Sequence, residues 1–323
     1  MQTRADLRFA IVGTGGVGGY FGALLHRGGA SVSFLARGRH LEAMRERGLR
    51  VESERGNILV PAARIAASPA EAGEADVVLF CVKSYDTESA ARSVSPLLHD
   101  GTIVISLQNG MDNEQAIERV IPRGTVFGGV AYVYATIAQA GVIAEWGGPR
   151  KIVFGPLARS EYLLDRGRAI LQTMLDAGVD AECSSEITEV LWRKFLFIAA
   201  VGGVTALTRL TLGEILESPE TRALLRSAME EALAVAAASG AVIEPGHLDA
   251  VFERLKKYDN SLRSSLYHDL AHKRRLEIES LSGAVVRIGR QRGIATPVHE
   301  VILAALIPYH RRAVAAMNGP AKP

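Results

Sequence analysis

The stretch FAIVGTGGVGGYFG at residues 9–22 determines the fold that the sequence predicts. Its apolar residues 9–12 indicate a buried strand, and the apolar pattern after the glycines indicates a helix through Leu25. Between them lies a G-x-G-x-x-G turn, in which the glycines allow a tight bend, close approach of the backbone to a pyrophosphate, and close packing of helix on strand. The phosphates would contact the free N–H groups at the helix start. We therefore predict that a dinucleotide binds at Gly13, Thr14, Gly15, Gly16, Val17 and Gly18; the alternative is a flexible glycine-rich turn in another α/β protein.

Length and composition exclude several classes of protein. A chain of 323 residues predicts about two domains, and 48% hydrophobic with 22% charged residues is ordinary for a globular protein. The net charge is +2, with no basic run interleaved with aromatics, so nucleic acid is disfavoured. Two cysteines, Cys81 and Cys183, give no disulfide framework and fit the reducing cytoplasm. The longest apolar run, 195–207, is too short for a membrane span, and we predict neither a membrane segment nor a metal site.

A second strand, Ser31–Leu35, is followed by Ala36-Arg37-Gly38-Arg39. NAD-binding units place an acidic residue here to hold the ribose 2′-hydroxyl. This chain has no acid at that point and offers two guanidinium groups, which suit a 2′-phosphate because arginine binds phosphate bidentately. We therefore predict NADP(H) rather than NAD as the cofactor; the alternative is a solvated basic turn.

Two further apolar runs, 76–82 and 102–107, are typical of buried parallel strands. Lys83 follows the first and Asn109 the second. Ligands of open α/β sheets bind beyond the carboxyl ends of the strands, so both side chains are candidates for ligand contact. The alternatives are a solvated loop lysine and a simple Asn-Gly turn.

Strand signals continue to about Ser185 and then stop. The fold class is therefore α/β: an N-terminal Rossmann-type parallel-sheet domain at 1–185, followed by an all-α domain at 186–323. Before the boundary we predict a β-ribbon at 49–60, strands at 126–137, 142–145, 151–155 and 179–183, and helices at 41–47, 86–98 and 161–177. After it we predict long helices at 186–206, 219–239, 245–257, 272–292 and 297–317.

The first of the long helices carries one conspicuous cation. Beyond Arg193 and Lys194 it is almost wholly apolar, and a helix that is apolar all round is buried. Lys194 falls beside Leu191 and Ile198, so its amine should point into the interior or a cleft, and lysine is rarely buried without a function or a partner. The alternative is a side chain that extends to solvent from the first turns.

Two more groups of polar residues lie further along. The segment 258–269 is rich in hydroxyl and amide groups, whose serines could bind a carboxylate or only cap a helix. In the predicted helix 272–292, Glu277 shares a stripe with Leu281 and Ala284, which suggests a paired, partly buried carboxylate. The alternative, favoured when this stripe is taken alone, is a surface ion pair with Lys273 or Arg274.

Several spaced motifs together make the chain resemble the ketopantoate reductases (2-dehydropantoate 2-reductases) along nearly its full length. They are VGTGGVGG at 12–19, LAR at 35–37, CVKSYD at 81–86, QNGM at 108–111, LWRKF at 191–195, SSLYHD at 264–269, LEIESLSG at 276–283 and RGIATP at 292–297. The resemblance implies a helical second domain like that of 6-phosphogluconate dehydrogenase. It also implies NADPH-dependent reduction of a 2-oxo acid to a 2-hydroxy acid, most simply 2-dehydropantoate to pantoate in pantothenate biosynthesis.

The resemblance also implies roles for individual residues. Residues 13–18 would hold the pyrophosphate, and Arg37 the 2′-phosphate. Lys83, Asn109 and Thr136 would contact the cofactor. The substrate would be bound by Asn109, Lys194 and Ser265. Lys194 would be the proton donor, with Glu277 near it to offset the cost of its burial.

The chain departs from the family at three polar positions. The family has asparagines four and eight residues after the lysine, where this chain has Ile198 and Gly202, and a third asparagine aligns with Leu212. We therefore expect this wall of the substrate site to be apolar, and roomier at Gly202, which favours a 2-oxo acid with a more apolar or bulkier end. A non-catalytic NADP(H)-binding protein is the remaining alternative, although such a protein needs neither Lys194 nor Glu277. The sequence leaves the oligomeric state open, with a homodimer among the options.

Overall fold

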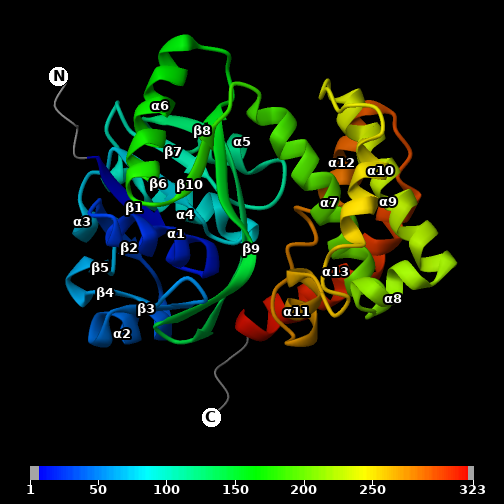
Figure 1. Cartoon of the computed structure of the whole chain (residues 1–323), viewed down its shortest axis with the longest axis horizontal. Helices are drawn as coiled ribbons and strands as arrows, with labels where there is room; N and C mark the ends of the chain where they lie inside the picture. Colours follow the sequence, from blue (N-terminus) through cyan, green and yellow to red (C-terminus); the bar gives the residue numbers. More distant parts are fainter. Residues whose placement is uncertain (1–6, 319–323) are drawn as a thin grey trace. The chain divides into compact units, whose positions relative to one another are not determined.

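In this computed structural model, which describes residues 7–318, the chain divides into two compact units (Figure 1). The sheet unit comprises 1–108 and 113–190, and the helical unit comprises 109–112 and 191–323. The division falls inside helix α7 (Ile187–Thr208) rather than at its first residue. Residues 1–6 and 319–323, at the outer ends of the two predicted domains, lie outside the described part of the chain.

The sheet unit is built on one ten-stranded sheet that is mostly parallel. Its strand order is β4-β3-β9-β8-β7-β6-β1-β2-β5, with β10 paired to β9. Within the described residues, the pairs β3–β4 and β8–β9 run antiparallel and the other pairs run parallel. The strands are β1 (Arg8–Val12), β2 (Ser31–Leu35), β3 (Leu49–Ser53), β4 (Ile58–Val60), β5 (Ile65–Ala66), β6 (Val77–Phe80), β7 (Ile103–Ser106), β8 (Thr125–Gln139), β9 (Val142–Pro156) and β10 (Asp180–Cys183).

Helices cover both faces of this sheet because every second strand residue points to the opposite side. Phe9 and Ile11 of β1 belong to one buried cluster with residues of α1 and α6, whereas Ala10 and Val12 belong to a second cluster with residues of α4. The predicted Rossmann-type domain is therefore confirmed. Its helices are α1 (Gly16–Arg27), α2 (Gly38–Arg47), α3 (Pro69–Ala72), α4 (Thr87–Ser93), α5 (Asn113–Glu118) and α6 (Glu161–Asp176), with short 3₁₀ turns at Ala62–Arg64, Ser84–Asp86 and Ser95–Leu97.

Two sequence predictions in this unit need correction. The strands predicted at 142–145 and 151–155 are one continuous strand, β9, because the Gly147-Gly148-Pro149 interruption is absorbed by register shifts against β8 near Tyr134. The helix predicted at 86–98 is shorter, since α4 ends at Ser93 and a 3₁₀ turn follows.

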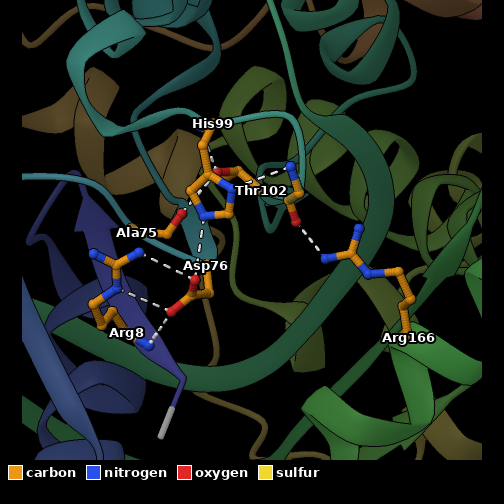
Figure 2. Close-up of polar contacts among 7 residues, drawn as sticks. Arg8, Ala75, Asp76, His99, Thr102 and Arg166 are labelled. Carbon is orange, nitrogen blue, oxygen red and sulfur yellow. Dashed lines mark hydrogen bonds and ion pairs between the residues drawn. The ribbon is translucent and has the colours of Figure 1, made fainter. Parts of the chain in front are cut away.

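A cluster of polar residues connects the amino ends of β1 and β6, at the sheet edge opposite the glycine turn (Figure 2). Asp76, just before β6, accepts hydrogen bonds from the Arg8 backbone N–H at 2.8 Å and from Arg8 Nε at 3.1 Å. His99 Nε2 lies 3.2 Å from the same carboxylate, and the Thr102 hydroxyl donates to the Ala75 carbonyl at 2.7 Å. Burial raises the pKa of Asp76, but the hydrogen bonds from Arg8 and His99 outweigh it and lower that pKa overall.

Replacing Asp76 by asparagine should therefore lower the free energy of unfolding, by about 1–2 kcal/mol at neutral pH for a partly exposed charge pair. A carboxyl whose pKa is lowered by folding stabilises the protein above the pKa of the unfolded chain, and this contribution is lost as the pH falls. The difference between the wild type and Asp76→Asn in urea unfolding should thus shrink below about pH 4. Glu74→Gln, an exposed acid two residues away, should change little; equal losses for both variants would contradict this account.

The helical unit is packed around α7. Its other helices are α8 (Leu212–Glu217), α9 (Pro219–Ala238), α10 (His247–Leu255), α11 (Ser265–Ala271), α12 (Ser282–Arg292) and α13 (Pro297–Asn318). One buried cluster contains residues of all seven helices, among them Phe195, Leu225, Phe252 and Ile302. The predicted all-α second domain is confirmed, although the short helices α8 and α11 were missed.

Helix α7 is long and apolar enough, by length and composition alone, to cross a membrane. The apolar run 195–207 lies within this longer helix, because Arg193 and Lys194 do not end it. Some 67% of its most apolar window is buried within the protein, as in the core helix of a globular protein.

The helix predicted at 272–292 was wrong over its first half. Helix α12 begins only at Ser282, and the ten residues before it form turns and irregular backbone. Lys273 adopts a left-handed backbone with φ 55°, which breaks any helix running through from α11. Glu277 therefore lies in the loop between α11 and α12 and not on a helical stripe with Leu281 and Ala284.

Candidate functional site

The glycine turn after β1 is closely packed on three sides and open on one. A β-carbon at Gly13 would lie 2.7 Å from the Val82 backbone nitrogen, one at Gly16 would lie 2.2 Å from the Ala135 carbonyl oxygen, and one at Gly18 would lie 2.4 Å from the Gly13 carbonyl oxygen. A β-carbon at Gly15 would meet no protein atom within 4 Å. Packing therefore explains three of the glycines, whereas Gly15 leaves open space in front of the first turn of α1. That space and the helix N-terminus fit a pyrophosphate.

The strand order places this turn at the switch point of the sheet. Strand β1 pairs with β2 on one side and with β6 on the other, with Val12 opposite both Leu35 and Phe80. The chain therefore leaves β1 and β6 side by side at their carboxyl ends, where open α/β sheets bind ligands. Lys83 follows β6 within the same unit, and its side chain is half-buried.

A buried amide holds the turn that carries Lys83. The Gln108 side-chain amide donates to the Val82 carbonyl at 3.0 Å and to the Thr87 hydroxyl at 2.8 Å. The Thr87 hydroxyl lies 2.8 Å from the Ser84 carbonyl. These bonds fix the backbone on both sides of Lys83. Gln108 was not predicted as a site residue, although a buried polar residue between a strand and Asn109 was a signal in the sequence.

The predicted 2′-phosphate residue also has a partner that the sequence analysis missed. Arg37 is the N-cap residue of α2, and its side chain is 70% exposed. Its guanidinium lies 3.7 Å from the Asp86 carboxylate, at the end of the CVKSYD segment. The guanidinium is thus exposed and only loosely paired, so an incoming phosphate can compete for it.

Thr136, which is predicted to contact the cofactor, lies on β8 beside the start of α1. A β-carbon at Gly16 would clash with Ala135, and it would also lie 2.9 Å from the Thr136 backbone nitrogen. Strand β8 therefore runs directly past the first residue of α1, with the Thr136 side chain exposed.

In the helical unit, Lys194 and Ile198 are both half-buried on α7, one turn apart, and Gly202 follows another turn on and is buried. The preceding cation, Arg193, is engaged elsewhere, since its Nε donates to Glu244 at 3.1 Å. A β-carbon at Gly202 would make ordinary contacts, at 3.7 Å from Leu281 and 3.9 Å from Leu266. The contacts that a side chain at position 202 would make are therefore apolar, and packing does not require a glycine there; the Gly202 carbonyl oxygen accepts from the Thr205 and Ser264 hydroxyls at 3.3 and 3.4 Å.

The two serines of the 264–269 motif have different surroundings. Ser264 is the N-cap of α11 and accepts a hydrogen bond from the Tyr267 N–H at 3.0 Å. Its hydroxyl also lies 2.7 Å from that of Thr205 on α7. Ser265 is exposed at the first position of α11. Leu212 is 1% exposed and packs in the hydrophobic core of the helical unit.

Glu277 is 6% exposed, which excludes the alternative of a surface ion pair. Its neighbours Leu276 and Ile278 are buried in the same core as α7. Asn109 is half-buried and belongs to the short segment 109–112, whose Met111 packs against that core. The helical unit therefore contains Asn109, Lys194 and Glu277, and the sheet unit contains the other predicted cofactor residues.

Comparison with known proteins identifies the same family over both units. The family model "Ketopantoate reductase PanE/ApbA" matches residues 9–159, and "Ketopantoate reductase PanE/ApbA C terminal" matches residues 186–310.

Individual relatives match over nearly the whole chain. A 2-dehydropantoate 2-reductase of Halobacterium salinarum is 32% identical, with 90% of this chain and 95% of the relative covered. An uncharacterized oxidoreductase of Bacillus subtilis is 28% identical, over 94% of this chain and 99% of the relative. A crystal structure of a PanE/ApbA family ketopantoate reductase from Ralstonia eutropha superposes with a TM-score of 0.85 at 32% identity, over 95% of this chain and all of that chain.

Proposed function

Because this chain belongs to the ketopantoate reductase family, we propose that it is an NADPH-dependent reductase that converts a 2-oxo acid to a 2-hydroxy acid. The first candidate reaction is that of its named relatives, 2-dehydropantoate to pantoate. The cytoplasmic location and the homodimer stay predictions, and size-exclusion chromatography with light scattering tests the latter.

The observation that carries the proposal is the half-buried Lys194, which is followed on its helix by an almost wholly apolar run. NADPH, when bound, supplies the hydride for the carbonyl carbon. Negative charge then develops on the carbonyl oxygen, and an ammonium within hydrogen-bond reach stabilises it and donates a proton. In this proposal Lys194 is that group, and the buried Glu277 carboxylate offsets the cost of burying it.

The remaining predicted residues bind and orient the cofactor and the substrate. The open space at Gly15 takes the pyrophosphate, Arg37 takes the 2′-phosphate, and Lys83 and Thr136 contact the cofactor. Asn109 contacts both cofactor and substrate, and Ser265 binds the substrate. Gln108 supports this arrangement by fixing the turn around Lys83.

Arg37→Ala should weaken NADPH binding by about 10–100-fold, because a charge-assisted bond to the 2′-phosphate is lost. NADH has no such phosphate, so its dissociation constant should stay the same. Titration of both nucleotides by calorimetry measures the two effects. Arg45→Ala, which removes a surface cation of the same helix that pairs with Glu71, serves as the control. Equal weakening of NADPH and NADH would contradict the assignment of Arg37.

The surroundings of Gly202 favour a second candidate within the same reaction class. Leu266 and Leu281 lie in front of this position, and Ile198 precedes it by one turn. Apolar walls of this kind bind alkyl or aromatic groups and discriminate weakly between them, whereas sites that bind a hydroxyl reject analogues without it by large factors. A 2-oxo acid with a more apolar or bulkier end than 2-dehydropantoate is the substrate class that this wall favours.

The deciding experiment follows NADPH oxidation with 2-dehydropantoate beside branched and aromatic 2-oxo acids. A higher kcat/KM for 2-dehydropantoate would support the reaction of the named relatives, and a higher value for the other acids would support the apolar class. Gly202→Asn is the matched variant: an added amide should shift preference toward the hydroxylated acid. NADPH binding without turnover of any acid would contradict both candidates and favour a non-catalytic NADP(H)-binding protein.

A further inference from the structure

A histidine from the last helix holds the loop that carries Glu277. Nδ1 of His310, on α13, accepts a hydrogen bond of 3.0 Å from the Leu276 backbone N–H, and the bond is buried. The His310 side chain is 10% exposed. Since Nδ1 accepts, the neutral ring carries its proton on Nε2. That nitrogen lies 3.9 Å from the carboxylate of Glu279, which is largely exposed.

The loop depends on this bond because its backbone is neither helical nor paired in a sheet. The Arg274 N–H donates to the Asp269 carbonyl at one end, and the Leu281 N–H donates to the Glu277 carbonyl at the other. Between these bonds, Leu276 and Ile278 are 1% and 0% exposed, so their backbone groups need protein partners. The Leu276 N–H finds its partner in a side chain 34 residues away. The ring therefore fixes the peptide unit that joins Arg275 to Leu276, one peptide unit before the one that leads into Glu277.

We propose that His310 is a positioning residue for the reductase reaction: by holding the Leu276 N–H, it sets the buried carboxylate of Glu277 and, through that carboxylate, the amine of Lys194. This inference rests on the proposed function, in which Glu277 offsets the burial of Lys194. His310 touches neither substrate nor cofactor in this role. Its loss should act on turnover more than on NADPH binding, because the cofactor residues of the sheet unit are unchanged.

The test compares two amides of the same chemistry at position 310. The side-chain oxygen of asparagine can occupy the place of Nδ1 and accept from Leu276, whereas the amide of glutamine extends toward the place of Nε2. His310→Leu removes both nitrogens. For each variant, kcat, KM, the NADPH dissociation constant, the melting temperature and the exchange rate of the Leu276 amide hydrogen are measured on the full chain with its best 2-oxo acid.

We expect His310→Gln and His310→Leu to lose kcat roughly tenfold to a hundredfold, as a misplaced reacting group does. His310→Asn should keep most of the activity and the slow exchange of the Leu276 amide. Equal kcat for the asparagine and glutamine variants would overturn the proposal, because the ring would then only fill space or have no role. A wild type that reduces no 2-oxo acid would instead reject the proposed function, and the catalytic role of His310 with it.

Discussion

Lys194→Ala should lower kcat by about 10²–10⁴-fold, the usual contribution of a positioned proton donor. The dissociation constant for NADPH should stay within about twofold, since an interaction made with the reacting oxygen alone is lost from turnover and not from cofactor binding. The physical reason is the placement of the lysine. Lys194 is half-buried on α7 of the helical unit, whereas the glycine turn and Arg37 belong to the sheet unit.

The neighbouring cation provides a matched control. Arg193 is one residue away, and its Nε donates to Glu244. Arg193→Ala removes the same charge from the same helix, so it should keep most of the activity. If Lys194→Ala lost NADPH binding and turnover in equal measure, the lysine would serve to bind or to fold. If Arg193→Ala lost as much activity as Lys194→Ala, general electrostatics and not proton donation would explain the effect.

The sheet unit could be predicted closely because its signals are local. Continuous apolar runs followed by glycine turns give both the strand and its carboxyl end, and therefore place Gly15 and Lys83 at the ligand-binding edge. The partner of Arg37 could not be predicted in the same way. Asp86 follows a different strand, and only the strand order brings the two side chains within 3.7 Å.

The loop before α12 shows where sequence periodicity misleads. Glu277, Leu281 and Ala284 have helical spacing, yet tertiary contacts decide the conformation. Leu276 and Ile278 are both buried, and the Leu276 N–H is bound by His310 from α13. No local sequence pattern predicts a hydrogen bond between a backbone N–H and a side chain that is 34 residues away. By contrast, helix α8 had a readable signal, since Thr211 and Glu214 form a capping box.

A pair of alanine substitutions in the glycine turn should separate cofactor binding from folding. Gly15 has φ −88° and ψ −160°, which alanine adopts without strain, and its β-carbon would touch no protein atom. Gly15→Ala should therefore leave the free energy of unfolding within about 0.5 kcal/mol of the wild type. It should nevertheless weaken NADPH binding by roughly tenfold or more, because the methyl group takes the space through which the pyrophosphate approaches the backbone.

Gly16→Ala should do the opposite, because its β-carbon would lie 2.2 Å from the Ala135 carbonyl oxygen. Either α1 or β8 must move, which costs about 1–3 kcal/mol of stability. Urea unfolding and NADPH titration of both variants give the comparison. If Gly15→Ala bound NADPH as tightly as the wild type, the open space would not be the pyrophosphate site. If Gly15→Ala unfolded as readily as Gly16→Ala, packing within the protein alone would explain the glycine at position 15. If the glycine turn binds the cofactor, Gly15→Ala should be stable but bind NADPH weakly, whereas Gly16→Ala should be destabilised.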